Sequence, residues 1–392
     1  MWFSKKKQAA VYGVMDVGAD AIKGVVFEMP PEDDGGRAAS AALPRVLKKF
    51  VGDLPMSCSP LRKIKKIKES VFIIAENIGK APDKITVALG PEVGECVLQD
   101  WVLPVAGDVP LTGKNVRAAY RDLFNQRADA RRAMIAVPVE VLVNGYPWAG
   151  QEQASRGRIT GAPHGYEIRF RVMTLSLSVD SGVFFAEVQR GLVGIATEFI
   201  PLVVAEREAL GEALGIRDAF LIDIGAEVTA LVSVRDGRLA HVAFMPVGIR
   251  CIAGIAAKKY RYSLRDARGM MRRYAAGGMR DDASMPVSAA ASEGVAEWKK
   301  NFVRALDAFY PTGPLSPAVL LAGGGAHYPE IKAAVASGDW LGGFSYAEKP
   351  VLRVLEGAAF FNGDTLGGNM RGPEDAGLAA LMAYVAHRRP IF

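Results

Sequence analysis

The stretch "FLIDIGAEVTALV" (residues 220–232) runs from apolar residues into an acid and a glycine, and then into a second apolar run. This order predicts a strand, a tight turn and a return strand, because β-branched and apolar runs favour strands while Asp and Gly favour turns. Two interpretations fit the turn. It is an ordinary hairpin, or it is a phosphate loop in which Gly225 lets backbone N–H groups reach an anion and Asp223 holds a magnesium ion through water. The stretch alone does not decide between them.

The same acid–glycine turn occurs much earlier in the chain. In "VYGVMDVGADAIKGVVFEM" (residues 11–29), Asp16 and Gly18 also lie between two predicted strands. A pattern repeated in this way indicates two related halves. A run of three glycines at residues 323–325 lies between a predicted strand and a predicted helix, where backbone N–H groups are able to meet an anion. Together the three loops predict one cleft that holds a nucleoside triphosphate and its metal.

Length and composition describe an ordinary globular protein. The chain has 392 residues, half of them apolar, and a net charge of +6, so two domains or lobes are expected and a nucleic-acid partner is not. Cys58, Cys96 and Cys251 lie far apart without the spacing of a metal site, and the four histidines are scattered. With no recognisable signal peptide and no apolar run of membrane length, we expect a cytoplasmic protein without disulfides.

The rest of the chain divides into further predicted elements. Residues 59–79 predict a helix with Ser59 as its N-cap. Residues 85–178 contain several strands around a helix at residues 114–127, with Thr112 as a cap, and predict a small inserted α+β unit. Other helices are predicted at residues 181–215 (two helices joined by a short loop), 263–275, 293–309 and near the end of the chain.

The order of the three glycine loops is similar to that of the actin-like ATPase superfamily. Residues 16–23 resemble its first phosphate motif, residues 223–229 its second, and residues 320–326 its adenosine motif. The resemblance covers nearly the whole chain. It implies an α/β, actin-like (ribonuclease H-like) two-lobed fold with duplicated sheet-and-helix halves, and ATP and Mg2+ as cofactors.

The resemblance also implies the residues of the site. Asp16 and Asp223 are expected to hold the metal, and Lys23 to offer a positive charge to the phosphates. The residues expected to bind the nucleotide are Asp16, Gly18, Lys23, Asp223, Gly225, Thr229, Gly323, Gly324 and Gly325. No residue is recognisable as one that orients the attacking water, so no catalytic residue is predicted and ATP hydrolysis is expected to be slow or absent.

The inserted unit distinguishes members of the superfamily. Residues 110–124, 139–177 and 263–278 resemble segments of FtsA, the actin-like protein of bacterial cell division, and the place of the insertion is also similar to PilM of type IV pilus assembly. The implied lobes are residues 1–84 with 179–212 (first lobe), 85–178 (inserted, SHS2-like subdomain of FtsA type), 213–257 with 317–392 (second lobe) and 258–316 (outer subdomain).

Three functions follow from this resemblance. The first is an FtsA-like scaffold that links FtsZ filaments to the division machinery at the membrane. The second is a PilM-like component of type IV pilus assembly, which the end of the chain soon after the last predicted helix favours, because FtsA carries an amphipathic tail there. The third is a small-molecule kinase of the same superfamily, although the catalytic acid that it needs is not recognisable.

The expected partners depend on whether the protein is an FtsA-like or a PilM-like scaffold. FtsZ is expected to contact the outer subdomain, where Arg265, Arg268 and Arg272 have the spacing of one helix face and are able to meet an acidic tail. An ordinary solvated basic helix is the alternative. Self-association into filaments and binding of cytoplasmic peptides of membrane proteins are the other expected interactions.

Several positions depart from the superfamily pattern. Ala19 replaces a hydroxyl, and Asp20 follows it, where an acid repels a phosphate unless a cation lies between them. The other departures are Glu227 and Val228 in the second loop, Gly248 with Ile249 in place of a double glycine, and Arg268 and Met271 in place of a Glu and a Lys.

Overall fold

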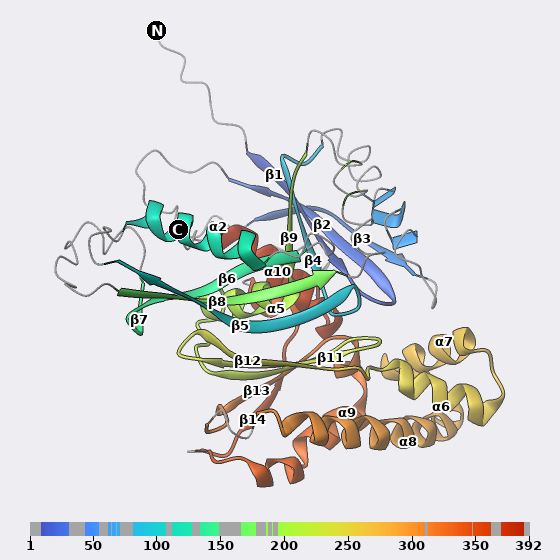
Figure 1. Ribbon diagram of the computed structural model, residues 1–392. Coiled ribbons are helices and arrows are strands. Elements are labelled where there is room, and N and C mark those ends of the chain that lie inside the picture. The colour runs from blue at the N-terminus through green and yellow to red at the C-terminus, as the bar shows by residue number, and fades with distance from the viewer. Residues whose placement is uncertain are drawn as a thin grey trace.

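A computed structural model provides the structure of the protein. It describes residues 9–30, 44–54, 81–106, 112–127, 134–148, 166–177, 195–309, 313–346, 348–361 and 370–387, together with single residues within 62–70 and at 186 and 190. Two sheets of five strands lie one above the other in Figure 1, with helices between them and a third sheet beside them.

The first sheet has the strand order β3–β2–β1–β4–β9. β1, β2 and β3 pair antiparallel, whereas β4 pairs parallel with β1, and β9 pairs parallel with β4. The strands span Ala10–Val17 (β1), Ala21–Met29 (β2), Arg45–Asp53 (β3), Lys84–Leu89 (β4) and Ala196–Pro201 (β9). The strand that ends in the first acid–glycine turn is therefore the central one.

The second sheet repeats this arrangement in the order β12–β11–β10–β13–β14, with the same strand directions. Its strands are Ala219–Ile224 (β10), Thr229–Arg235 (β11), Arg238–Met245 (β12), Ala318–Ala322 (β13) and Val351–Val354 (β14). β10 is the equivalent of β1, and it ends in the second acid–glycine turn. The duplication of halves predicted from the repeated turn is confirmed.

Two helices fill the space between the sheets. They are α5 (Leu202–Glu212), which connects β9 to β10, and α10 (Ala376–His387), near the end of the chain. The helices pack against each other, and α10 also packs on β1 and β2 of the first sheet (Figure 1). One apolar core therefore includes residues of both sheets and both helices, such as Val14, Leu221 and Leu381, so that the two halves share their buried surface.

The third sheet, in the order β5–β8–β6–β7, is all antiparallel and carries one described helix, α2 (Gly113–Arg127). Its strands are Gly94–Val105 (β5), Met134–Val143 (β6), Tyr146–Pro147 (β7) and Tyr166–Leu177 (β8). Trp101, Val116 and Phe170 form its own core. As expected, Thr112 caps α2, because its Oγ1 accepts a hydrogen bond of 3.2 Å from the Asn115 N–H. The sheet begins at Gly94, since β4 belongs to the first sheet.

The outer part of the second half is helical. It contains α6 (Arg250–Tyr260), α7 (Leu264–Ala275), α8 (Asp281–Leu306) and α9 (Pro329–Ala336), with short 3-10 helices at Gly324–His327 (η2), Asp339–Gly343 (η3), Gly357–Phe360 (η4) and Pro373–Asp375 (η5). α7 matches its predicted bounds because Ser263 caps it, accepting from the Asp266 N–H at 3.1 Å. α8 begins twelve residues earlier than predicted, since its first turns pack on α6.

Two other helical segments were predicted, at residues 181–215 and 59–79. Residues 181–215 were expected to form two helices, but residues 196–201 are β9, because pairing with β4 satisfies their backbone groups. Most of the helix predicted at residues 59–79 lies outside the described residues; those described within 62–70 are helical. Among the described helices, none has the length and apolar character to cross a membrane.

Candidate functional site

Both acid–glycine turns are closed by the same hydrogen bond. The Gly18 N–H donates to the Ala21 carbonyl oxygen at 3.1 Å, and the Gly225 N–H donates to the Val228 carbonyl oxygen at 2.9 Å. A Cβ on Gly225 would lie 2.9 Å from that carbonyl oxygen, which is closer than a side chain tolerates. The two turns thus place the acids of β1 and β10 in equivalent positions.

A cavity of about 430 Å³ lies between the halves, and both acids line it. The predicted site residues that line this cavity are Asp16, Gly18, Lys23, Asp223, Gly225, Gly323 and Gly324. Thr229 and Gly325 are not brought to it. The cavity is also lined by residues that the sequence did not predict to bind the nucleotide, namely Asp20, Glu92, Arg272, His327 and Glu374.

The charges at the inner end of the cavity are mostly negative. Burial raises the pKa of Asp16, and burial together with the charge of Asp16 raises the pKa of Asp223 to about 6. Lys23 lies directly opposite Asp16 in the β1–β2 register and lowers both pKa values, but it does not cancel the effect of burial. A positively charged ligand beside the two acids would favour their ionised forms.

Two further carboxyl groups surround these acids. Glu92 and Glu206 line a smaller cavity of about 50 Å³ together with Asp16 and Asp223. Burial is the main cause that raises the pKa of Glu92 to about 7 and the pKa of Glu206 well above its usual range, and the two aspartates add to both shifts. Among the described atoms, Glu92 Oε2 and Glu206 Oε2 are buried without a hydrogen-bond partner.

The sequence contains one signal that points to Glu206. In "LVVAEREALGE" it lies three residues after Val203 and four before Leu210, so it occupies the apolar face of α5. An acid on a buried helix face requires an explanation, and its position beside Asp16 and Asp223 supplies one. Within the ranges the structure describes, no three His, Cys, Asp or Glu side chains are grouped to ligate one metal ion directly.

The 3-10 helix η5 contacts the first sheet beside the cavity. Lys23 Nζ donates to the Glu374 carbonyl oxygen, and Lys49 Nζ lies 2.6 Å from Asp375 Oδ2. The Glu374 side chain bonds His327 Nε2, and this contact holds the pKa of Glu374 to about 2. Lys23 therefore both lines the cavity and ties η5 to β2.

The glycine run is explained in large part by close packing. Gly323 has a φ of 79° and its N–H donates to the Pro373 carbonyl oxygen at 3.0 Å, so that this donor is already used within the protein. A Cβ on Gly325 would overlap the Ile224 side chain. Gly324 differs, because the nearest atom to an added Cβ is Ile249 Cδ1 at 3.6 Å, and it lines the cavity.

Thr229 serves the core of the second half. Its side chain is fully buried, and its hydroxyl donates to the Val247 carbonyl oxygen at 2.8 Å while accepting from Trp298 Nε1 at 3.1 Å. The sequence pattern places a threonine after the second turn, but the structure directs its hydroxyl away from the cavity.

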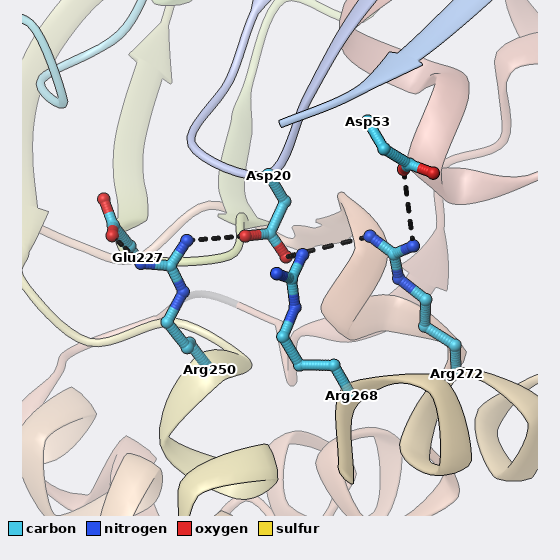
Figure 2. Close-up of polar contacts among 6 residues, drawn as sticks. All are labelled: Asp20, Asp53, Glu227, Arg250, Arg268 and Arg272. Atoms are coloured by element: carbon cyan, nitrogen blue, oxygen red, sulfur yellow. Dashed lines mark hydrogen bonds and ion pairs between the residues drawn. The ribbon is translucent and has the colours of Figure 1, made fainter. Parts of the chain in front are cut away.

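The arginines expected to form one solvent-exposed face of the outer subdomain need a correction. Arg268 and Arg272 of α7 do lie on one face, but this face is turned towards the first half, where both contact Asp20 (Figure 2). The Arg268 side chain is only 14% exposed. Helical spacing predicted a shared face but not its direction, because the direction depends on how α7 packs against α6 and α8.

The comparisons with known proteins identify the fold. No protein-family model matches the sequence, and no curated protein matches it at a significant level. Among solved structures, a chain of the PilM–PilN type IV pilus biogenesis complex is 18% identical, with a TM-score of 0.59, and the match covers 97% of this chain and 99% of that one. The ethanolamine utilization protein EutJ from Carboxydothermus hydrogenoformans is 12% identical, with a TM-score of 0.48 and coverage of 97% and 91%.

At these identities a structural likeness establishes the fold and nothing finer. The likeness over nearly the whole length of both chains agrees with the two identically ordered sheets and the paired acid–glycine turns. This protein has the actin-like ATPase fold.

Proposed function

We propose that this protein is a cytoplasmic actin-fold scaffold that binds ATP with Mg2+ between its two halves and acts by assembling with other proteins. The observation that carries the proposal is the cavity of about 430 Å³, into which two equivalent turns present Asp16 and Asp223. A volume of this size is typical of sites for small molecules and cofactors.

The chemistry of the lining suits both ligands. Mg2+ prefers oxygen ligands, keeps several of its waters and is usually bound through only one or two carboxylates, so it fits a site with a pair of acids such as Asp16 and Asp223. Its charge would favour the ionised forms of Asp16 and Asp223, whose pKa values burial raises. Lys23 and Arg272 add positive charge at the phosphate side, and Gly324 offers a backbone surface without a side chain.

We propose that hydrolysis is slow or absent. Ala19 and Val228 stand where hydroxyl groups are expected in the two phosphate loops, and the nearby Thr229 hydroxyl is engaged by Val247 and Trp298. Phosphoryl transfer depends on fixed donors that stabilise the transition state, and these loops have lost several of them. The output of such a protein is its conformation and its contacts.

Calorimetry tests nucleotide binding. We expect the wild type to bind ATP in the presence of Mg2+, with little or no phosphate release. Asp223→Asn is expected to weaken this binding about tenfold, which is the effect of losing roughly one charge-assisted hydrogen bond. Asp307→Asn, an exposed acid of the second half, is the matched control and should bind like the wild type. Absence of binding at millimolar ATP would sink the proposal, and rapid phosphate release would overturn its second part.

For the partner, the likeness to the PilM–PilN complex supports a PilM-like role better than an FtsA-like one. We therefore propose that the scaffold binds a cytoplasmic peptide of a membrane protein. The FtsA-like role is the second candidate, with FtsZ as partner and self-association into filaments. Its proposed contact is weakened because Arg268 and Arg272 already bind Asp20.

A peptide-binding assay separates the two roles. We expect fluorescence anisotropy to detect binding of short cytoplasmic peptides from pilus membrane proteins. An FtsZ tail peptide is expected not to bind at either low or high salt. Binding of the FtsZ peptide that disappears in Arg265→Glu would instead support the FtsA-like role, because Arg265 is an exposed member of the α7 basic residues. A small-molecule kinase would show phosphorylation of a sugar or acetate in a parallel assay.

A further inference from the structure

The departures of the two phosphate loops from the superfamily pattern meet in one ion cluster. The cluster consists of three acids and three arginines (Figure 2), which are Asp20, Asp53, Glu227, Arg250, Arg268 and Arg272. Asp20 lies in the β1–β2 turn, and Glu227 occupies the same position of the β10–β11 turn. In the sequence, Asp20, Glu227 and Arg268 are separate departures from the superfamily pattern, but in the structure they belong to one cluster with equal numbers of acidic and basic side chains.

Asp20 is the centre of the cluster. Its Oδ1 lies 2.6 Å from Arg250 Nη2, and its Oδ2 binds Arg268 Nη2 and lies 3.8 Å from Arg272 Nη2. All three guanidinium groups belong to the second half, whereas Asp20 belongs to the first. The carboxylate of Asp20 therefore connects the two halves at the edge of the cavity.

Arg250 links both turns. It binds Glu227 through Nη1 and Asp20 through Nη2, so it contacts the acid of each turn at once. The backbone holds it in place, since the Arg250 N–H donates to the Ala226 carbonyl oxygen at 2.9 Å. The position of this arginine is thus set by the second phosphate loop itself.

The cluster is largely shielded from water. The side chains of Asp20, Arg250 and Arg268 are 13%, 17% and 14% exposed. The Coulomb attraction between charges in such surroundings is screened less than between exposed charges. Asp53 and Arg272 form a more exposed pair at 3.5 Å on the outer side.

Guanidinium groups bind carboxylates and phosphates through the same charge-assisted hydrogen bonds. Asp20, Ala226 and Arg272 all line the cavity, so a phosphate between the two turns would approach the carboxylate of Asp20 and the guanidinium group of Arg272, which lies 3.8 Å from that carboxylate. Phosphate and Asp20 would thus compete for one set of donors.

We propose that Asp20 is a built-in competitor of phosphate. Its carboxylate binds the arginines of the second half, ties the halves together without nucleotide, and lowers the affinity of the cavity for ligands that carry phosphate groups. The inference rests on the proposed nucleotide site and adds its regulation. It accounts for Asp20, Glu227, Arg250 and Arg268 together, where the sequence offered only an acid that repels phosphate.

The competition is tested with inorganic pyrophosphate, using calorimetry on the full chain. Asp20→Asn keeps the shape of the side chain and removes its charge, and it is expected to raise the affinity for pyrophosphate about tenfold while leaving adenosine binding unchanged. Glu293→Gln removes one exposed acid, from α8 of the second half, and controls for net charge. A pyrophosphate affinity within twofold of the wild type, or no pyrophosphate binding by either protein, would overturn the competition.

The tie between the halves is tested without any ligand. Spin labels at Lys48→Cys and Met285→Cys, both exposed and on opposite halves, report their separation in a chain whose native cysteines are replaced. Asp20→Asn and Arg268→Gln are expected to lengthen or broaden the distance distribution, and high salt should do the same to a smaller extent. Arg273→Gln on the same helix serves as the control and is expected to have no effect.

These readouts separate this inference from the nucleotide proposal. If the distribution widens in Asp20→Asn but neither protein binds ATP, the proposed function fails and the tie stands. If ATP binds and the distribution is unchanged in both Asp20→Asn and Arg268→Gln, the tie is overturned and the proposed function stands. The spin-label measurement uses two separate variants, Asp20→Asn and Arg268→Gln, so the tie is still tested if one of them does not fold.

Discussion

Replacing Gly323 with alanine is expected to lower the free energy of unfolding by about 3 kcal/mol and to abolish ATP binding. Gly323 has a φ of 79°, a conformation that L side chains rarely adopt. An added Cβ would also lie 2.5 Å from the Ile224 carbonyl oxygen and overlap the carboxylate of Asp223. The loop would have to move away from the end of β10, and the proposed metal-binding acid would move with it.

The neighbouring Gly324 provides the matched control for this prediction. Gly324→Ala places its Cβ 3.6 Å from Ile249 Cδ1, which is an ordinary contact, and Gly324 has no positive φ. We expect its free energy of unfolding to stay within about 0.5 kcal/mol of the wild type. Urea denaturation measures both variants. Equal losses at the two positions would show that the run of glycines responds to side chains in general rather than to the packing of Gly323.

Glu206→Gln is expected to stabilise the ligand-free protein at pH 7.5 by about 1–3 kcal/mol, because it removes a buried ionisable group whose negative charge burial disfavours. Burial and the charges of Asp223 and Asp16 raise the pKa of Glu206. An acid whose pKa is raised on folding stabilises the protein below its unfolded pKa, here 4.5, and this contribution is lost as the pH rises through the folded value. The benefit of the substitution should therefore be large at pH 7.5 and small at pH 4.5.

The stability of the wild type is expected to fall with rising pH for the same reason, over a defined pH range. The pKa values of Asp223 and Glu92 are raised to about 6 and about 7 from 3.8 and 4.5, so their contribution to stability is lost between about pH 4 and pH 7. Glu374 acts in the opposite direction, but its pKa of about 2 confines that effect to lower pH. Urea denaturation between pH 5 and pH 7.5 measures the slope.

Glu212→Gln is the control for the Glu206 prediction. Glu212 is the last residue of α5 and is exposed, so its removal is expected to change neither the stability nor its pH dependence by more than about 0.5 kcal/mol. Destabilisation of Glu206→Gln at pH 7.5 would contradict the prediction and would mean that the carboxylate has a favourable partner in the ligand-free protein.

The local parts of the site were predictable. A strand followed by an acid and a glycine is recognisable from neighbouring residues, and both acid–glycine turns form where Asp16 and Asp223 indicated. The repeat of this pattern was enough to predict two equivalent halves, because each half must build the same hairpin at the centre of its sheet. β9 was missed because its strand character comes from pairing with β4, more than a hundred residues away.

The sequence by itself thus determined the two hairpins, the duplication and the actin-like order of the loops, since turn chemistry and strand patterns act between residues close in the chain. Only the tertiary structure decided what surrounds them. Glu206 lies beside Asp16 and Asp223 because α5 lies between the sheets. Asp20 pairs with Arg250 and Arg268 because the two halves pack against each other. Charges interact through space, so whether Asp20 repels a ligand or binds an arginine depends on groups more than two hundred residues further along the chain.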